Sequence, residues 1–486
     1  MSTRLSSRVA AAFLLSAALS LAACTAPDLG PRPSMRAPAS LDSGRTLASA
    51  APMALWPEEH WWTAYGDPQL NALVAEALAN SPSVATAEAR IRQARGAMRV
   101  AGAEGLPNLG AQASGGLTKQ SYNTNPGAPP EFIPHGWKST GTLALTGEFD
   151  LDLWGKARNS LAAATSEELA AEADARQAAL MLSANVVSSY FDLGRLMERG
   201  KALEEARKAR GALVELTRQR VDLGVENEGP LRQAEATAAG ARLTVSANAE
   251  QVLLRRHALA ALLGAGPDRG LAITAPQFAA IPETQLPADA GIALAGRRPD
   301  IVAARLRAEA ASSRIEVARA AFMPDVSLSG LIGLTSLGLS NLIDSGSTYG
   351  NVGGALSLPI FQGGRLKGNF TQARGAYDAA VANYNQTVIG ALQDVADALT
   401  SRDASAAQEQ DAVQANEKAA AGYDIALKRY RGGLSNYLEV LTAQTAALAA
   451  RETAIDAHFR TLALEVALKR ALGGGFEDEQ EKGASR

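Results

Sequence analysis

Four segments of the chain alternate apolar and polar residues with a period of two. Their apolar positions are Leu109, Ala111, Ala113, Leu117, Leu143, Leu145, Phe149, Leu151, Val326, Leu328, Ile332, Leu334, Val352, Leu356, Leu358 and Ile360. This alternation predicts strands with one apolar and one polar face. At about 10 residues and roughly 33 Å, each strand has the length of a tilted transmembrane strand. Loops at 119–138 and 336–349 would join them into two β-hairpins, at about 108–151 and 325–360.

Long helical stretches follow each predicted β-hairpin. No proline occurs between Gly155 and Leu223, so at ~1.5 Å per residue this stretch is on the order of 100 Å long. Near the end of the chain, apolar residues at intervals of seven are typical of helices packed side by side, as in coiled coils: Leu441, Leu448, Ile455 and Leu462. Turns near Gly224 and Gly433 divide the two stretches into helical hairpins, at about 155–264 and 363–472. The expected fold class is mainly α with a transmembrane β part.

Two proline pairs with the same spacing of 25 residues reveal an internal repeat: Pro82 with Pro107, and Pro299 with Pro324. The segment "RVDLGVENEGPLRQAEA" also aligns with "RYRGGLSNYLEVLTAQT", glycine on glycine and asparagine on asparagine. We therefore expect two structural repeats, 56–270 and 271–472, each with a helix, a β-hairpin and a long helical hairpin. The polar end of the chain, 473–486, is expected to be a flexible tail.

The predicted strands require more than one copy of the chain. Four strands are too few to close a barrel, since single-chain barrels begin at about eight. An open sheet edge in lipid would leave backbone groups unpaired, at a cost of several kcal/mol each. Copies of the chain are therefore expected to pool their strands by cyclic symmetry. Two copies or three would serve, and the strand count alone leaves both open.

Composition argues against several other functions. The formal net charge is −3, without the basic excess that nucleic-acid binding needs. The histidines are far apart in sequence and show no metal-ligand spacing: His60, His135, His257 and His458. The Gly-Lys pair at 155–156 lacks the glycine spacing and the Ser/Thr of a phosphate-binding loop. We expect neither an enzyme nor a metal site or dissociable cofactor.

The first residues have the pattern of a secretory signal. Arg4 and Arg8 precede an apolar run from Val9 to Leu21 that is short for a membrane-spanning helix. The chain's single cysteine, Cys24, follows in "LAAC", which resembles a bacterial lipobox, where the cysteine is acylated. We expect a signal peptide at 1–23, a covalent lipid on Cys24 and an extended, proline-containing tether at 24–55.

Five motifs in order resemble the outer membrane factor family, the TolC-like exit ducts of tripartite efflux pumps. They are "WWTAYGDPQLNALVAEALANSP", "FDLDLWGKAR", "RRPDI", "LSLPIFQGGRLKG" and "RYRGGLSNYLEVLTAQ", and the similarity runs from about Trp61 to Leu472. The lipidated OprM-like and NodT-like branch is the most similar. The resemblance implies a homotrimer whose twelve-stranded outer-membrane β-barrel continues into a periplasmic α-helical barrel. It also implies a passive duct in a Gram-negative bacterium, working with a periplasmic adaptor and an inner-membrane RND transporter.

The resemblance also implies functional positions at the helical turns. The implied adaptor contacts are Gly224, Val225, Gly433, Leu434 and Ser435. The alternative is that these turns only end helices, although one turn can do both, and adaptor contact is favoured.

The periplasmic gate would comprise four residues: Tyr430, Leu438, Glu439 and Thr442. Three copies of Glu439 would make a negative ring, but a helix-capping role three residues after Asn436 is an equal alternative. Thr442 departs from the family pattern, because many relatives carry Asp there.

Two alternatives from other classes share some of these features. A trimeric surface adhesin also pools strands and uses coiled coils, but it predicts one membrane segment and a long repetitive passenger. A periplasmic adaptor is often lipidated and carries a helical hairpin. It would lack paired strands of membrane length, however. The duplicated body favours the duct over both.

Overall fold

The computed structural model describes residues 26–47, 54–121, 129–278 and 284–478. The chain divides into two compact units. The strand unit contains Arg92–Ala170 and Arg305–Asn383, with the described residues up to Ser34. The helical unit contains the rest of the described chain, from Met35 onward. Each unit is described by itself.

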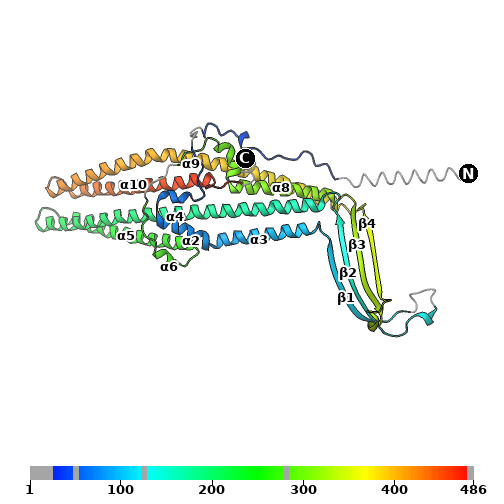
Figure 1. The fold of residues 1–486 in the computed structure, drawn as a ribbon. Helices are drawn as coiled ribbons and strands as arrows, with labels where there is room; N and C mark the ends of the chain where they lie inside the picture. Colours follow the sequence, from blue (N-terminus) through cyan, green and yellow to red (C-terminus); the bar gives the residue numbers. More distant parts are fainter. Residues whose placement is uncertain (1–25, 48–53, 122–128, 279–283, 479–486) are drawn as a thin grey trace. The chain divides into compact units, whose positions relative to one another are not determined.

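The strand unit holds one antiparallel sheet of four strands in chain order (Figure 1). The strands are β1 (Asn108–Thr118), β2 (Lys138–Leu151), β3 (Asp325–Leu337) and β4 (Thr348–Ser357). Both expected β-hairpins are present, and the second ends at Ser357, a little earlier than expected. The third pairing, between β2 and β3, joins the two repeats in one sheet.

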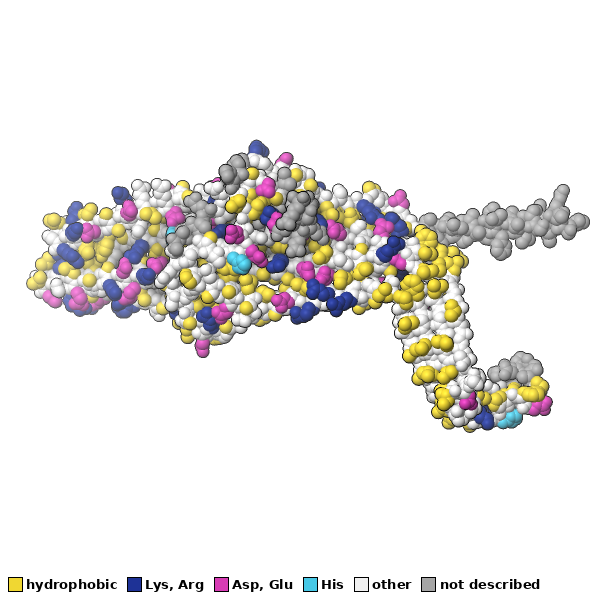
Figure 2. Space-filling view, in the orientation of Figure 1, with side chains coloured by type: hydrophobic (Ala, Val, Ile, Leu, Met, Phe, Trp, Pro, Cys, Tyr) yellow, Lys and Arg dark blue, Asp and Glu magenta, His cyan; other side chains and the backbone are white. Residues whose placement is uncertain are grey.

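The register collects the apolar positions on one face of the sheet. Leu145 lies opposite Ala111 on β1 and opposite Ile332 on β3. This face is open in the single chain, with Leu109 83% and Val352 92% exposed, and Figure 2 shows apolar side chains along the strands. An exposed apolar surface of this kind marks a contact with another protein or with lipid.

The helices reproduce the repeat residue for residue. α3 (Pro82–Ala103) and α8 (Pro299–Ala320) have 22 residues each, α4 (Lys156–Asp222) and α9 (Arg365–Arg431) have 67 each, and α5 (Glu228–Leu262) and α10 (Tyr437–Ala471) have 35 each. A constant shift of 209 positions relates α4 to α9 (365 − 156) and α5 to α10 (437 − 228). Within the described residues, no helix is both long and apolar enough to cross a membrane.

Short helices supply the rest of the helical unit. They are η1 (Pro38–Ser40), η2 (Trp61–Tyr65), α2 (Pro68–Asn80), α6 (Pro267–Leu271) and α7 (Ala290–Arg297), while η3 (Pro130–Phe132) and η4 (Leu339–Asn341) lie in the strand unit. The ring of Tyr65 packs edge to face against Trp61 and Phe191, and all three side chains are buried. Asp67 caps α2 and also accepts a hydrogen bond from the Tyr190 hydroxyl at 2.8 Å. This aromatic core ties α2 to the middle of α4.

The expected N-terminal tether is docked along α9 where it is described. In the strand unit, Arg374 donates hydrogen bonds to the carbonyl oxygens of Gly30, at 3.1 Å, and of Pro31. The Tyr377 hydroxyl donates to the carbonyl oxygen of Pro33 at 3.1 Å. An extended, proline-rich chain leaves its carbonyls free, so a buried arginine can hold it. The expected signal peptide at 1–23 and Cys24 lie outside the described residues.

The start of the expected flexible tail is packed, which corrects the boundary drawn at 473. Gly473, Gly474 and Gly475 all have positive φ angles, between 59° and 88°. These left-handed residues bring the backbone against Arg297 and Glu58. The amide of Asp478 then donates to the carbonyl oxygen of Gly296 at 2.9 Å. The packed chain therefore extends at least six residues beyond Leu472.

Candidate functional site at the tips of the helical hairpins

The two helical hairpins turn with the same backbone geometry. Gly224 and Gly433 have φ angles of 73° and 76°, so both adopt the left-handed conformation that ends α4 and α9. The next amides, of Val225 and Leu434, donate back to carbonyl oxygens five residues earlier, at 2.9 and 2.8 Å. We call residues 223–227 and 432–436 the tips. The positions expected to contact an adaptor all lie in them.

Asparagine caps the helix that follows each tip. The Asn227 side chain accepts a hydrogen bond from the Gly229 amide at 2.9 Å, and Asn436 accepts one from the Glu439 amide at 3.0 Å. Glu439 thus takes part in the cap through its backbone. Its carboxylate is exposed and has no hydrogen-bond or ion-pair partner among the described residues. The capping alternative and a solvent-facing charge are therefore compatible.

The tips carry an exposed apolar surface. Leu434 is 74% exposed and Leu438 59% exposed, and Leu223 and Val225 are exposed as well. Thr442 is exposed one turn beyond Leu438, and its hydroxyl donates to the Leu438 carbonyl oxygen at 2.8 Å. Large aliphatic side chains on a tight turn cannot bury themselves locally. They mark a surface that another chain covers.

Tyr430 is buried, which separates it from the other three expected gate residues. Its hydroxyl donates to a Glu226 carboxylate oxygen at 2.6 Å and lies 3.2 Å from the Thr217 hydroxyl. Burial, together with the bond to Glu226, raises the pKa of Tyr430 to about 12. Its place in the gate stays a prediction, and its side chain is buried where those of Leu438, Glu439 and Thr442 are exposed. The side chain instead joins the two helical hairpins.

Arg220 completes a polar cluster around Tyr430. Its guanidinium bonds Glu226 at 3.2 Å, donates to the Tyr430 carbonyl oxygen at 3.1 Å, and lies 4.7 Å from the centre of the tyrosine ring. We call Thr217, Arg220, Glu226 and Tyr430 the tip cluster. Sequence reasoning missed Glu226 and Thr217, because their partner is more than 200 residues away.

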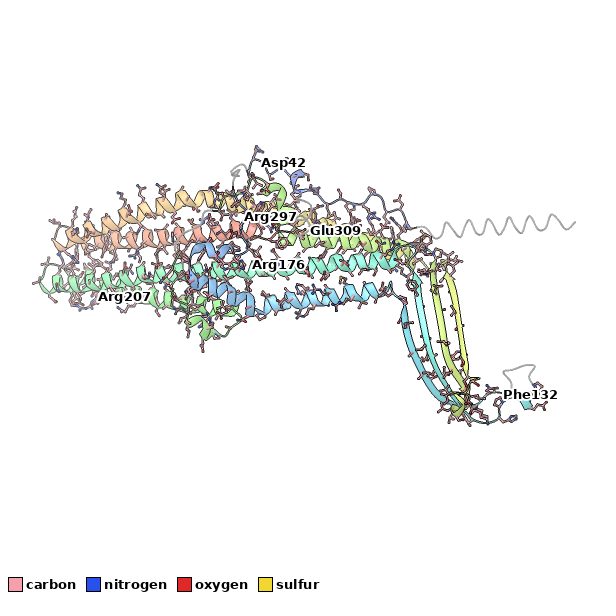
Figure 3. All side chains as sticks on the ribbon, in the orientation of Figure 1. Asp42, Phe132, Arg176, Arg207, Arg297 and Glu309 are labelled. Carbon is pink, nitrogen blue, oxygen red and sulfur yellow. The ribbon has the colours of Figure 1, made fainter. Side chains whose placement is uncertain are left out.

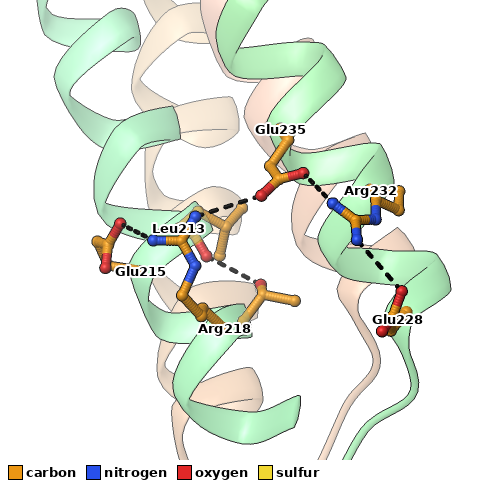
Figure 4. Close-up of polar contacts among 7 residues, drawn as sticks. Leu213, Glu215, Arg218, Glu228, Arg232 and Glu235 are labelled. Atoms are coloured by element: carbon orange, nitrogen blue, oxygen red, sulfur yellow. Dashed lines mark hydrogen bonds and ion pairs between the residues drawn. The ribbon is translucent and has the colours of Figure 1, made fainter. Parts of the chain in front are cut away.

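Ion pairs on the outside of the first helical hairpin hold α4 to α5 (Figure 4). Arg218 pairs with Glu215 on its own helix and with Glu235 on α5, at 3.0 and 3.2 Å. Arg232 bridges Glu235 and Glu228. The hydrogen bonds from Arg218 and Arg232 lower the pKa of Glu235. These pairs are exposed, so their main effect is to fix how the two helices align.

A second set of ion pairs joins α4 to α10. Arg195 pairs with Asp456 at 3.0 Å, Arg199 with Glu452 at 2.9 Å, and Glu205 with Arg451. Arg207, labelled on α4 in Figure 3, pairs with Glu204 on its own helix. Because α4 and α10 belong to different repeats, these three pairs bind the two repeats to each other.

The described residues contain no group of three or more His, Cys, Asp or Glu side chains placed to hold a metal ion. An open apolar sheet face and paired helical hairpins with apolar tips define a channel-forming protein of the outer membrane. The model of the family described as "Outer membrane efflux protein" matches residues 73–265 and 293–474. The chain belongs to this family.

Known proteins are similar over most of the chain. The cation efflux system protein CusC of Escherichia coli (strain K12) is 30% identical over 464 residues, which are 94% of this chain and 98% of that protein. The fusaric acid resistance protein FusA of Burkholderia cepacia is 35% identical over 346 residues, 70% of this chain. The alignment spans 64% of FusA, less than two thirds of its length.

Solved structures agree with this assignment. The outer membrane protein VceC of Vibrio cholerae has a TM-score of 0.82 and 41% identity, covering 87% of this chain and all of that one. The CmeC outer membrane channel of Campylobacter jejuni has a TM-score of 0.84 and 26% identity, covering 95% and 97%. The expected fold class, outer-membrane location and role as an efflux channel are confirmed.

Proposed function

We propose that three copies of this chain form the exit duct of a tripartite efflux pump, each contributing β1–β4 to a twelve-stranded barrel. The observation that carries the proposal is the sheet itself. Its apolar face is open, and within the described residues β1 and β4 each pair on one side only. Such edges are costly in lipid, and pairing the β1 edge of one copy with the β4 edge of the next removes them. The periplasmic helices would then close into a second, α-helical barrel.

In this assembly the tips form the periplasmic end and contact the hairpins of a periplasmic adaptor, which links the duct to an inner-membrane RND transporter. The exposed Val225 and Leu434 support this role, since aliphatic turns are suited to docking on another protein. Among the relatives, CusC is named for cation efflux and MdtP for multidrug resistance. That range fits a passive conduit whose cargo is selected by its transporter.

Leu438, Glu439 and Thr442 would line the constriction of the closed duct. Three copies of Leu438 make an apolar ring that resists wetting, and three copies of Glu439 make a ring that attracts cations. Thr442 adds no charge, so we expect a weaker cation preference than two acidic rings would give. Tyr430 would act from behind this ring, by holding the two tips of one chain together.

Replacing Leu438 with Ser is expected to raise single-channel conductance severalfold, because a polar ring wets more easily than an apolar one. The measurement is the conductance of the purified protein in planar bilayers. Leu434→Ser is the matched control: the same change on the tip should leave conductance unchanged and weaken capture by an adaptor hairpin. Unchanged conductance in Leu438→Ser would remove Leu438 from the constriction.

Cys24 is proposed to carry the covalent lipid. The support is the lipobox-like "LAAC" sequence, and the carbonyl contacts of Arg374 fix the chain a few residues downstream. Labelling of the full chain with palmitate should succeed in the wild type and fail in Cys24→Ala. Equal labelling of the two proteins would disprove the assignment.

A further inference from the structure

All the connections between strands and long helices lie at one end of the sheet. The register places Asn108, at the start of β1, opposite Glu148 near the end of β2. It likewise places Asp325, at the start of β3, opposite Ser357 at the end of β4. The helices of this outer-membrane channel project into the periplasm, so this end of the sheet meets the periplasmic leaflet.

The connections at this end carry large apolar side chains that remain exposed. Trp154 follows β2 and is 49% exposed, and Phe361 follows β4 and is 88% exposed. The Trp154 indole donates to the Pro324 carbonyl oxygen at 2.8 Å, which holds its ring at the start of β3. Figure 2 shows apolar side chains gathered where the strands meet the helices. We call six exposed residues the junction belt: Leu106, Leu153, Trp154, Leu358, Ile360 and Phe361.

The junction belt continues the apolar face of the sheet. Leu153 keeps the period of two that Leu151 has at the end of β2. After β4, Leu358 and Ile360 keep the period of Leu356 in the same way. The face that contacts lipid in the proposed barrel therefore extends to the helices. Aromatic residues at the border of such a face are typical of the boundary between acyl chains and headgroups.

Basic residues follow the junction belt directly in both repeats. The shift of 209 positions carries Lys156 onto Arg365 and Arg158 onto Lys367. All four side chains are exposed, and the first turns of α4 and α9 contain no acidic residue. Cations at the start of a helix oppose the helix dipole. Helix stability therefore does not account for a basic pair that occurs in both repeats.

In the first repeat the basic pair has carboxylate partners. Arg158 pairs with Asp152 at 3.2 Å, and the same carboxylate accepts the Arg158 backbone amide at 2.9 Å. Lys156 lies 3.9 Å from a carboxylate oxygen of Asp325. These contacts satisfy much of the positive charge at the start of α4.

In the second repeat the basic pair lacks such partners. The shift places Phe361 where the first repeat has Asp152, so the capping carboxylate is replaced by an exposed ring. Arg365 donates to the neutral side-chain oxygen of Gln362. The Lys367 side chain has no hydrogen-bond or ion-pair partner among the described residues. Two cations next to an aromatic ring are thus left for an external anion.

We propose that the start of α9 binds the phosphate of an anionic phospholipid in the periplasmic leaflet. Arg365 and Lys367 contact the headgroup, and Phe361 lies among the upper acyl chains. A guanidinium binds phosphate through two parallel hydrogen bonds, while an ammonium adds a compact charge. Charge complementarity and continuity with the lipid-facing sheet both select this occupant. The inference rests on the proposed barrel, in which the apolar face contacts lipid.

The N-terminal tether reaches the same level of the molecule. Ala26, the first described residue, packs with Leu366 against the buried cluster that includes Phe322 and Phe370. Cys24 lies two residues earlier, within about 7 Å of extended chain. An acyl chain on Cys24 would therefore enter the membrane beside the start of α9, which agrees with a headgroup contact there.

Competition between two phospholipids tests the proposal. The purified full chain in detergent is mixed with equal amounts of phosphatidylglycerol, which is anionic, and phosphatidylcholine, which is zwitterionic. Native mass spectrometry then counts the lipids bound. We expect the wild type to favour phosphatidylglycerol about fivefold or more, because each cation near the headgroups favours an anionic lipid by roughly that factor.

The double variant Arg365→Gln/Lys367→Gln should lose most of this preference. Its matched control is Lys201→Gln/Lys418→Gln, which removes the same charge at exposed lysines outside the junction belt and should keep it. Phe361→Ser should bind fewer phospholipids of both kinds without changing their ratio, because it removes apolar contact and no charge.

Three results would overturn the proposal. They are no preference in the wild type, the same preference in the Arg365/Lys367 variant, or an equal loss in the control variant. Excess inorganic phosphate should leave the lipid bound, and complete displacement would assign the cations to a free anion instead. Failure of the proposed barrel would appear separately, as absence of conductance in the wild type.

Discussion

Gly473→Ala is expected to lower the free energy of unfolding by about 3 kcal/mol. Gly473 has a φ angle of 84°, a conformation that costs an L-residue roughly 1–2 kcal/mol. A Cβ at this position would also collide with the carbonyl oxygen of Arg297, which is backbone and cannot rotate away. Relieving the collision would displace the chain that leads to Asp478, whose amide donates to the carbonyl oxygen of Gly296. Overpacking of this kind typically costs a further ~1–3 kcal/mol.

Gly363→Ala separates the two contributions. Gly363 also has a positive φ, 58°, but a Cβ there would meet no atom within 4 Å. The Gly363→Ala variant should therefore lose only the conformational contribution to the free energy of unfolding, about 1 kcal/mol. Thermal and denaturant unfolding of the detergent-solubilised proteins measures the free energy of unfolding lost in each of the two variants. Equal losses in the two variants would show that the contact of Gly473 with Arg297 does not contribute.

Lys469→Met is expected to remove a pH dependence of stability. The Lys469 side chain is buried, with its ammonium 4.6 Å from the centre of the Tyr65 ring and 5.6 Å from that of Trp61. Burial lowers its pKa to about 8, although the nearby Glu465 carboxylate opposes the shift. Burial also raises the pKa of Tyr65, so the tyrosine stays protonated where the lysine titrates.

The direction of this pH dependence follows from the protonation of Lys469 in the folded and in the unfolded chain. Below pH 8 the lysine is protonated in both the folded and the unfolded chain. Between about pH 8 and its ordinary pKa of 10.5, the folded chain has released a proton that the unfolded chain still binds, so stability rises with pH. At ~1.4 kcal/mol per pH unit, the wild type should gain about 2 kcal/mol between pH 7.5 and pH 9.5.

Unfolding measured at both pH values provides the test. The variant Lys469→Met should lack this gain, while Lys201→Met, at an exposed lysine on α4, should keep it. A gain that persists in Lys469→Met would assign the pH dependence to other groups.

The elements of the fold were predictable from local patterns. Alternating residues gave the four strands, and the heptad-spaced leucines gave the long helices, because side-chain periodicity is a property of each element alone. Gly224 and Gly433 end their helices as expected, since only glycine adopts the left-handed conformation without cost. Leu438, Glu439 and Thr442 are exposed, and their place in the gate stays a prediction.

The role of Tyr430 was not predictable in the same way. In sequence it stands beside the tip glycines and resembles another gate residue. Its burial depends on Glu226 and Thr217, which reach it only after the two helical hairpins have packed together. A repeat alignment does not help, because the repeat places Val221 at the equivalent position. The α4–α10 ion pairs were missed for the same reason.

By itself, the sequence determined the two repeats, their strands, helices and turns, and the residues that occupy the tips. Tertiary structure alone decided that residues 30–33 of the tether and residues 473–478 are packed, that Tyr430 joins the hairpins, and that Lys469 is buried. The physical reason is the range of the interactions. Periodicity and backbone conformation act over a few neighbouring residues, whereas burial and polar pairing depend on groups that lie hundreds of positions apart and meet only in the folded chain.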